Sequence, residues 1–161
     1  MPTLALLLAL LLAAPSHAQD SQDEGDLSYK AYVHSDKRIK CLYGYAADKT
    51  GDHAAAVAIF EDCIRRWNDV YSMIWLAQLY ETGIGVTKDL EQATALMRRG
   101  AHTNDDAAYA RLARYHYGVA LAEGRGTPQD IAQAKTWLRR AAQEGVPEAA
   151  DYLGRLEGAA P

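Results

Sequence analysis

Two cysteines carry the most reactive side chains in the sequence, and they lie 22 positions apart, at Cys41 and Cys63. A cysteine pair forms a disulfide in an oxidising compartment, whereas it remains as thiols in a reducing one. A catalytic redox pair is the least favoured interpretation, because such pairs typically lie close together as Cys-x-x-Cys. The sequence therefore predicts a disulfide between Cys41 and Cys63, with two buried free thiols as the alternative.

The other reactive residues follow no known catalytic or metal-binding pattern. The histidines lack metal-ligand spacing such as His-Glu-x-x-His, and the serines lack a nucleophile motif such as Gly-x-Ser-x-Gly. These residues are His34, His53, His102, His116, Ser35 and Ser72. Two segments, Gly83-Ile-Gly85 and Gly124-Arg-Gly126, are interpreted as repeat loops and not as phosphate loops, because no strand precedes them. We expect no catalytic residue, no metal and no cofactor.

The composition disfavours two classes of partner. The chain has 161 residues, with 17 Lys and Arg against 21 Asp and Glu, a net charge of −4 and 49% hydrophobic residues. Its length suits a single domain, and its apolar content is sufficient for a buried core. A net acidic chain without a run of basic residues lacks the electrostatic surface that binding to nucleic acid or an anionic membrane requires. Neither is expected as a partner.

Residues 1–18 have the pattern of a cleaved export signal. An apolar run over residues 4–14 precedes Ser16-His17-Ala18, which supplies the small side chains of a signal-peptidase site. The run is shorter than the roughly twenty residues of a membrane span. No Lys or Arg precedes the run, which departs from the usual pattern. We predict cleavage before Gln19, a flexible acidic leader over residues 19–29, and a periplasmic or secreted mature protein without a membrane span.

The rest of the sequence repeats itself. The stretch from Asp89 to Ala101 matches the stretch from Asp130 to Ala142 at a constant offset of 41 residues, and a weaker copy begins at Asp52. Two amphipathic helices per period, joined by Gly-rich loops, predict an all-α fold, an α-solenoid of stacked antiparallel helical hairpins. The predicted repeat domain covers residues 30–156, with units at about 36–69, 70–104 and 105–146, a capping half-repeat at 147–156 and a tail at 157–161.

Two kinds of position recur in every predicted unit. The second helices begin at acidic residues that suit helix N-caps, namely Asp52, Asp89 and Asp130. The first helices each have a small residue where a neighbouring helix is expected to pass close, namely Gly44, Ala77, Ala113 and Gly154. The loops match at an offset of 41 whereas the first helices match at 36, so we predict five inserted residues near residues 117–122.

This combination resembles the Sel1-like repeat family, a branch of the tetratricopeptide-like solenoids. The resemblance is carried by the run from Leu76 to Asp89 with its Gly-x-Gly loop, and by the run from Gly124 to Gly145 with Ala134 and Trp137. The first repeat lacks the Gly-x-Gly loop and is more similar to a plain tetratricopeptide unit. The resemblance implies an adaptor or scaffold, because members of the family work by holding partner proteins.

The first helices of such a solenoid line its concave side, so their residues outside the core should face a groove. Extending the register of Trp75 and Gln78 to the other first helices predicts an aromatic and basic stripe. Its members are Leu42, Tyr45, Trp75, Gln78, Arg111, Arg114, Tyr152 and Arg155. Because Arg and aromatic side chains dominate the binding energy of many interfaces, we expect a protein or peptide partner with acidic groups.

The sequence therefore predicts an exported, non-enzymatic interaction module that binds a partner polypeptide in its concave groove. Two alternatives remain open. One is a structural subunit of an envelope assembly, such as a motor or secretion component. The other is an enzyme, because cysteine-rich Sel1-like relatives are associated with penicillin binding or hydrolysis. This chain has a single cysteine pair, spaced unlike theirs, and shows no evident nucleophile or base.

Overall fold

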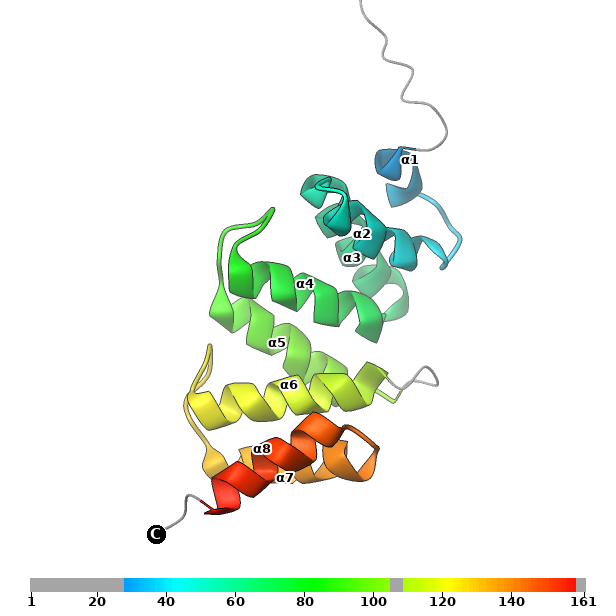
Figure 1. Cartoon of the computed structure of the whole chain (residues 1–161). Coiled ribbons are helices and arrows are strands. Elements are labelled where there is room, and N and C mark those ends of the chain that lie inside the picture. Colours follow the sequence, from blue (N-terminus) through cyan, green and yellow to red (C-terminus); the bar gives the residue numbers. More distant parts are fainter. Residues whose placement is uncertain (1–27, 105–108, 159–161) are drawn as a thin grey trace, which may run out of the picture.

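The computed structural model describes residues 28–104 and 109–158, and these residues form eight helices stacked in sequence order (Figure 1). The helices are α1 (Tyr29–Val33), α2 (Lys40–Lys49), α3 (His53–Trp67), α4 (Val70–Thr82), α5 (Leu90–Ala101), α6 (Tyr109–Glu123), α7 (Ile131–Gln143) and α8 (Pro147–Gly158). Three hairpins, α2/α3, α4/α5 and α6/α7, are followed by the single helix α8. The predicted all-α solenoid is confirmed. The predicted signal peptide lies outside the described residues.

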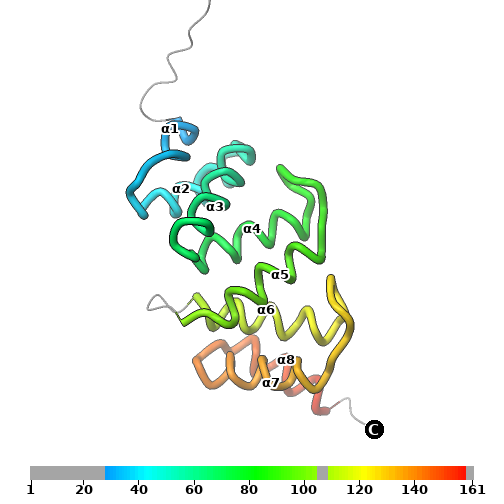
Figure 2. The backbone as a smooth tube through the Cα atoms, turned by 180° about the vertical axis from the view of Figure 1, so that it is seen from behind, coloured from blue at the N-terminus to red at the C-terminus, as the bar shows by residue number. Residues whose placement is uncertain are grey.

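The helices form two layers of unequal spacing. The helices α2, α4, α6 and α8 contact one another in turn, whereas the backbones of α3, α5 and α7 do not come into mutual contact (Figures 1 and 2). Because the elements lie closer together on the side of the first helices, the stack bends toward that side. We call the surface formed by α2, α4, α6 and α8 the inner face.

The ends of the helices follow the expected local chemistry. Asp52, Asp89 and Asp130 cap α3, α5 and α7, each carboxylate accepting a hydrogen bond from the backbone N–H three residues later. The glycines of both Gly-x-Gly loops have positive φ angles between 65° and 80°. A Cβ atom at Gly126 would overlap the carbonyl group of Leu90, so only glycine allows this loop to pack against the start of α5.

The disulfide between Cys41 of α2 and Cys63 of α3 is present, with the Cα atoms 6.0 Å apart, as predicted. It indicates an oxidising compartment. In the chain-entropy description, closing a loop of this length stabilises the fold by roughly 3 kcal/mol. Tyr29, Tyr32 and Val33 of α1 pack against the disulfide and its neighbour Ile59.

The predicted edges of the repeat domain differ from the helices by one or two residues. Tyr29, assigned to the flexible leader, belongs to α1 and packs against two core clusters. Glu157 and Gly158, assigned to the tail, complete α8. In both places a short helical extension has too few residues to show a periodic pattern in the sequence.

A buried ion pair lies beside the disulfide. The side chain of Lys40 is fully buried, and its ammonium group donates to the carboxylate of Asp62 and, at 2.7 Å, to the carbonyl of Val33. Burial lowers the pKa of Lys40. Because an unpaired buried charge is strongly unfavourable, Lys40 retains its charge only while Asp62 and the end of α1 stay in place. The pair thus holds α1 against the first hairpin.

The five-residue insertion predicted near residues 117–122 is not seen there, because α6 runs as one continuous helix over Tyr109–Glu123. The backbone N–H of Asp89 donates to the carbonyl of Tyr80, and that of Asp130 donates to the carbonyl of Leu121, 41 residues further on. The helices α4 and α6 therefore match at an offset of 41, like the loops that follow them. Gly118, and not Ala113, corresponds to Ala77, and a Cβ atom at Gly118 would lie 2.9 Å from Leu138 of α7.

Two glycines of the inner-face helices provide a paired test of helix packing. A Cβ atom at Gly44 would lie 2.5 Å from a ring carbon of buried Phe60, whereas one at Gly154 would meet nothing within 4 Å. The close approach predicted at Gly154 is therefore wrong.

We expect Gly44→Ala to lower the free energy of unfolding by about 1–2 kcal/mol through overpacking. Gly154→Ala should raise it by roughly 0.5–1 kcal/mol through helix propensity. Urea denaturation followed by circular dichroism measures both. Equal midpoints for the two variants would contradict the packing at Gly44.

Candidate partner-binding surface

The predicted residues of α2 and α4 meet on the inner face. Tyr45 is 37% exposed and its ring centroid lies 4.6 Å from that of Trp75, which is partly buried. The ammonium group of Lys49 lies 5.2 Å from the Tyr45 ring centroid and 5.1 Å from that of Trp75. Leu42 is 48% exposed, and Gln78 is exposed as well. The structure thus brings Tyr45 and Trp75 together, whereas Leu42 and Gln78 are exposed on the same two helices.

The aromatic surface extends further than the sequence analysis predicted. The rings of Trp75 and Tyr71 have centroids 6.1 Å apart, and Tyr71 lies 5.1 Å from Tyr109 of α6. We call Tyr45, Trp75, Tyr71 and Tyr109 the aromatic ladder; it crosses α2, α4 and α6. Tyr71 precedes Trp75 by four residues, so the sequence alone could have predicted that both lie on one helix face. The sequence could not have predicted the contact with Tyr109, because that contact depends on how the hairpins pack.

Burial raises the pKa of Tyr71 to about 12, with a smaller contribution from the neighbouring Tyr109. The Tyr71 hydroxyl therefore stays protonated at physiological pH and remains a hydrogen-bond donor.

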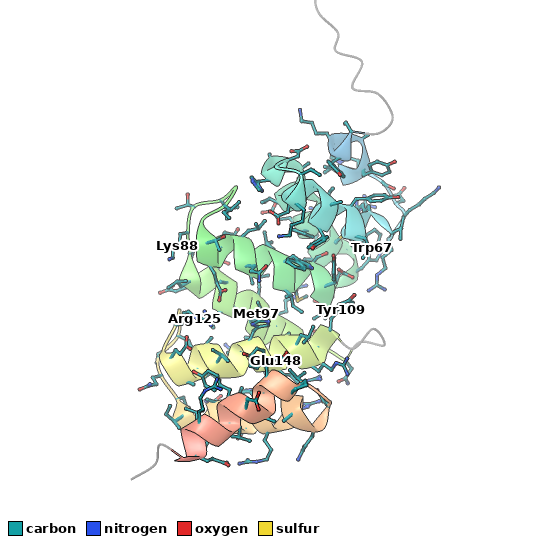
Figure 3. The ribbon with its side chains drawn as sticks, viewed as in Figure 1. Trp67, Lys88, Met97, Tyr109, Arg125 and Glu148 are labelled. Atoms are coloured by element: carbon teal, nitrogen blue, oxygen red, sulfur yellow. A yellow bond between two sulfur atoms is a disulfide. The ribbon has the colours of Figure 1, made fainter. Side chains whose placement is uncertain are left out.

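A cleft of about 680 Å³ adjoins the ladder. It lies between the start of α2, the α3–α4 connection and the residues on either side of 105–108, and its wall includes Ile39, which is 53% exposed, and Leu42. Trp67 and Tyr109, which border it, lie at the same side of the molecule (Figure 3). Arg38 forms a 3.1 Å ion pair with Asp69 at its edge. The cleft thus has a mixed lining, in which Ile39 and Leu42 lie beside the paired Arg38 and Asp69 and the polar residues Asn68, Thr103 and Asn104.

Arg111 and Arg114 do not belong to this surface, so their predicted role is wrong. Arg114 is only 5% exposed, and its guanidinium donates to the carbonyls of Ala101 and Thr103, at 3.0 and 2.9 Å, and to the carboxylate of Glu144 at 2.6 Å. Arg111 donates to the backbone carbonyl of Glu144 at 3.0 Å. Arg114 thus joins α6 to the ends of α5 and α7, and Arg111 joins it to the end of α7.

The misplaced insertion explains this error. At the offset of 41 that the structure shows, His116 and Val119 take the positions of Trp75 and Gln78, whereas Arg114 takes the position of the buried Met73. Burial lowers the pKa of His116, and the nearby Arg125 lowers it further, so this histidine is neutral at neutral pH. The helix α6 therefore adds no cation to the middle of the stripe.

The last two predicted residues lie on α8, beyond α6. Tyr152 packs against core residues and donates a hydrogen bond to Glu123 at 3.1 Å. Arg155 is exposed, with its guanidinium 5.0 Å from the Tyr152 ring centroid. These two residues form a separate patch. On α6, which lies between α4 and α8, the corresponding positions are taken by the half-buried His116 and the nearly buried Val119.

Several reactive side chains of the described residues are bound to neighbouring groups. Across residues 28–104 and 109–158, no group of three His, Cys, Asp or Glu residues is arranged to hold a metal ion. His53 contacts Asp48 at 2.9 Å, and His102 contacts the carbonyl of Arg98 at 2.8 Å. The Ser72 hydroxyl donates to Asp69, the N-cap of α4. These side chains have structural partners.

The two roles of arginine give a second paired test. We expect Arg114→Met to lower the free energy of unfolding by roughly 2–4 kcal/mol, because it removes the donor to the carbonyls of Ala101 and Thr103 and one of the two arginines paired with Glu144. Arg155→Met, at an exposed position, should change it by less than about 0.5 kcal/mol. Urea denaturation measures both free energies, and an unchanged m-value shows that the two variants unfold in the same way as the wild type. Similar values for both variants would show that Arg114 is not a structural residue.

Comparisons with known proteins agree with this architecture. A family model described as Sel1 repeat matches residues 70–104 and 107–146, which contain the hairpins α4/α5 and α6/α7. The human protein named Protein sel-1 homolog 2 is 34% identical over 65 residues, which is 40% of this chain and 9% of that protein. The chain thus spans less than a tenth of the length of this relative.

Two solved bacterial structures have a similar fold. One is c5321 of uropathogenic Escherichia coli strains, a protective antigen with an SLR fold. It has a TM-score of 0.72 and 20% identity, with 83% of this chain and 28% of that chain covered. The other is a Sel1 repeat protein from Oxalobacter formigenes, with a TM-score of 0.67 and 23% identity, covering 77% of this chain and 51% of that chain.

The family model thus identifies two Sel1 repeats in the chain, and the structural neighbours show that its sequential hairpins have the Sel1-like repeat fold.

Proposed function

We propose that this protein is an exported scaffold or regulatory adaptor that binds a partner polypeptide on its inner face. Sel1 repeats form a protein-interaction fold, in which stacked hairpins offer an extended surface. The observation that carries the proposal is the aromatic ladder, a continuous set of ring contacts that crosses three first helices on the inner face.

The distribution of exposed apolar side chains supports this surface. Among the described residues, six large hydrophobic side chains are the most exposed, and three of them, Ile39, Leu42 and Tyr45, follow one another along α2 and its start. They lie beside the ladder and the cleft. Clustered exposed apolar residues mark interaction sites, whereas single ones are ordinary. Aromatic side chains also supply much of the binding energy at such sites.

Export is part of the proposal. The disulfide favours an oxidising compartment, and the sequence of residues 1–18 has the pattern of a signal peptide. None of the helices in the described part of the chain is long and apolar enough to cross a membrane.

Intact mass spectrometry of the native protein, isolated without reductant, tests export and the disulfide together. We expect a chain that begins at Gln19, with no thiol available for alkylation. Retention of residues 1–18 in the mature protein would contradict export, and two alkylated cysteines would contradict the disulfide.

Site-specific crosslinking in intact cells tests partner binding. A photo-crosslinking amino acid replaces either Leu42, on the inner face, or Ile131, which is 38% exposed at the start of α7 and serves as the control. We expect a discrete protein adduct from position 42 and none from position 131. The adduct should weaken in a Tyr45→Ala background. No adduct at position 42, or the same adducts at both positions, would contradict binding on the inner face.

A further inference from the structure

We propose that the inner face recognises a proline-rich segment of the partner, bound in the extended polyproline II conformation with its proline rings stacked on the aromatic ladder. This inference rests on the proposed function and adds the chemistry of the partner to it.

The ladder has the form that such a segment requires. Its rings are in contact one after another, with centroid separations of 4.6 Å (Tyr45 to Trp75), 6.1 Å (Trp75 to Tyr71) and 5.1 Å (Tyr71 to Tyr109). They come from three helices and form a narrow strip that ends at the start of α6, where Tyr109 lies (Figure 3). With a rise of about 3.1 Å per residue, a polyproline II segment of roughly five residues matches the strip.

The hydrogen-bonding groups along the strip are mainly donors. Trp75 donates its indole N–H to the Tyr71 hydroxyl, so the donors left for a ligand are the hydroxyls of Tyr45 and Tyr71. Lys49 and Arg38 add cationic donors near the ring contacts. A proline-rich segment complements these donors, because its backbone offers many carbonyl acceptors and few N–H donors.

Other modes of peptide recognition fit less well. A partner strand needs the edge of a sheet, whereas the secondary structure of residues 28–104 and 109–158 is helical. A partner helix has already satisfied its backbone carbonyls internally, so it leaves the donors of the ladder without acceptors. Aromatic-lined surfaces that bind extended proline-rich chains remain as the matching mode.

The strip is held in place before binding. Trp75 and Tyr71 pack against the core cluster that contains Phe60 and Met73, and Lys49 lies over both Tyr45 and Trp75. Rings fixed in this way lose little conformational freedom when a ligand binds, and a polyproline II segment is itself largely pre-extended. Because little conformational entropy is lost on binding, several weak contacts along the ladder are enough to hold the segment.

The charges near the strip favour acidic residues beside the prolines. The side chain of Lys49 is 50% exposed and that of Arg38 is 65% exposed, although each is paired with an aspartate, Asp48 and Asp69. Because Arg114 is buried and Arg111 is bound to the carbonyl of Glu144, Lys49 and Arg38 are the cations that contribute, and ring stacking dominates. Binding should accordingly weaken only modestly as salt is raised.

An unbiased peptide selection tests the inference. A displayed library of random peptides of about ten residues, long enough to span the ladder, is panned on the purified, oxidised protein, after depletion on the empty support. We expect the enriched sequences to contain clustered prolines. The most enriched peptide is then synthesised with a fluorophore and titrated by anisotropy. Replacing its prolines by alanine should weaken binding at least about tenfold, equivalent to about 1.4 kcal/mol.

Protein variants locate the site. Tyr45→Ala and Trp75→Leu should each weaken binding of the selected peptide by about fivefold or more, whereas Ile131→Ala, on a second helix, should leave it unchanged. Far-ultraviolet circular dichroism verifies that each variant is folded. Tyr45→Ala removes a side chain that is already 37% exposed, so it keeps the test valid if Trp75→Leu unfolds.

Three outcomes overturn the inference: enrichment without an excess of proline or no enrichment at all, equal affinity of the alanine analogue, and unchanged affinity of Tyr45→Ala. Preferential binding of a chitin oligosaccharide to the ladder would also overturn it, since sugars stack on aromatic rings as well. If the crosslink from position 42 forms while proline-rich peptides fail to bind, the partner surface stands and only its assigned chemistry is wrong. If neither is found, the proposed function fails with it.

Discussion

The structure depends on one constraint: a two-helix unit of this size cannot bury its apolar face alone, so each hairpin needs a neighbour. The core clusters show this directly. One joins Phe60 of α3 to Met73 and Leu76 of α4, and the next joins Ala77 of α4 to Tyr117 of α6. Each of these two clusters spans more than one hairpin. The partner surface is a product of the same packing, because the ladder exists only where α2, α4 and α6 are held side by side.

The two ends of the stack meet this constraint in different ways. At the first hairpin, the disulfide, the Lys40–Asp62 pair and the tyrosines of α1 replace the missing neighbour. At the other end α8 covers the last hairpin with Ala149 and Leu153. The first hairpin also carries Leu42 and Tyr45. Cross-links therefore lie close to the candidate surface, where rigidity keeps the exposed rings in place.

The sequence was sufficient to predict the features that depend on local pattern. The hairpins, the acidic N-caps, the Gly-x-Gly loops and the disulfide all follow from spacing and residue type. The register of α6 did not follow, because Ala113 and Gly118 are both small and each matches Ala77 at a plausible offset. Only the packing of Gly118 against Leu138 and the bonds from Asp89 to Tyr80 and from Asp130 to Leu121 distinguish them. The ladder likewise needed a contact between residues 38 positions apart, Tyr71 and Tyr109.

Arg114 makes the last two hairpins unlike a simple tandem array. Its guanidinium extends from α6 to the end of α5 and to Glu144 after α7, so three helices of two different units share a single buried cation. Loss or duplication of a whole unit at this junction would bring an arginine into an interior that lacks its acceptors. Recombination can therefore add or remove repeat units more easily elsewhere in the stack. The helices α5, α6 and α7 are expected to be kept together as one unit during evolution.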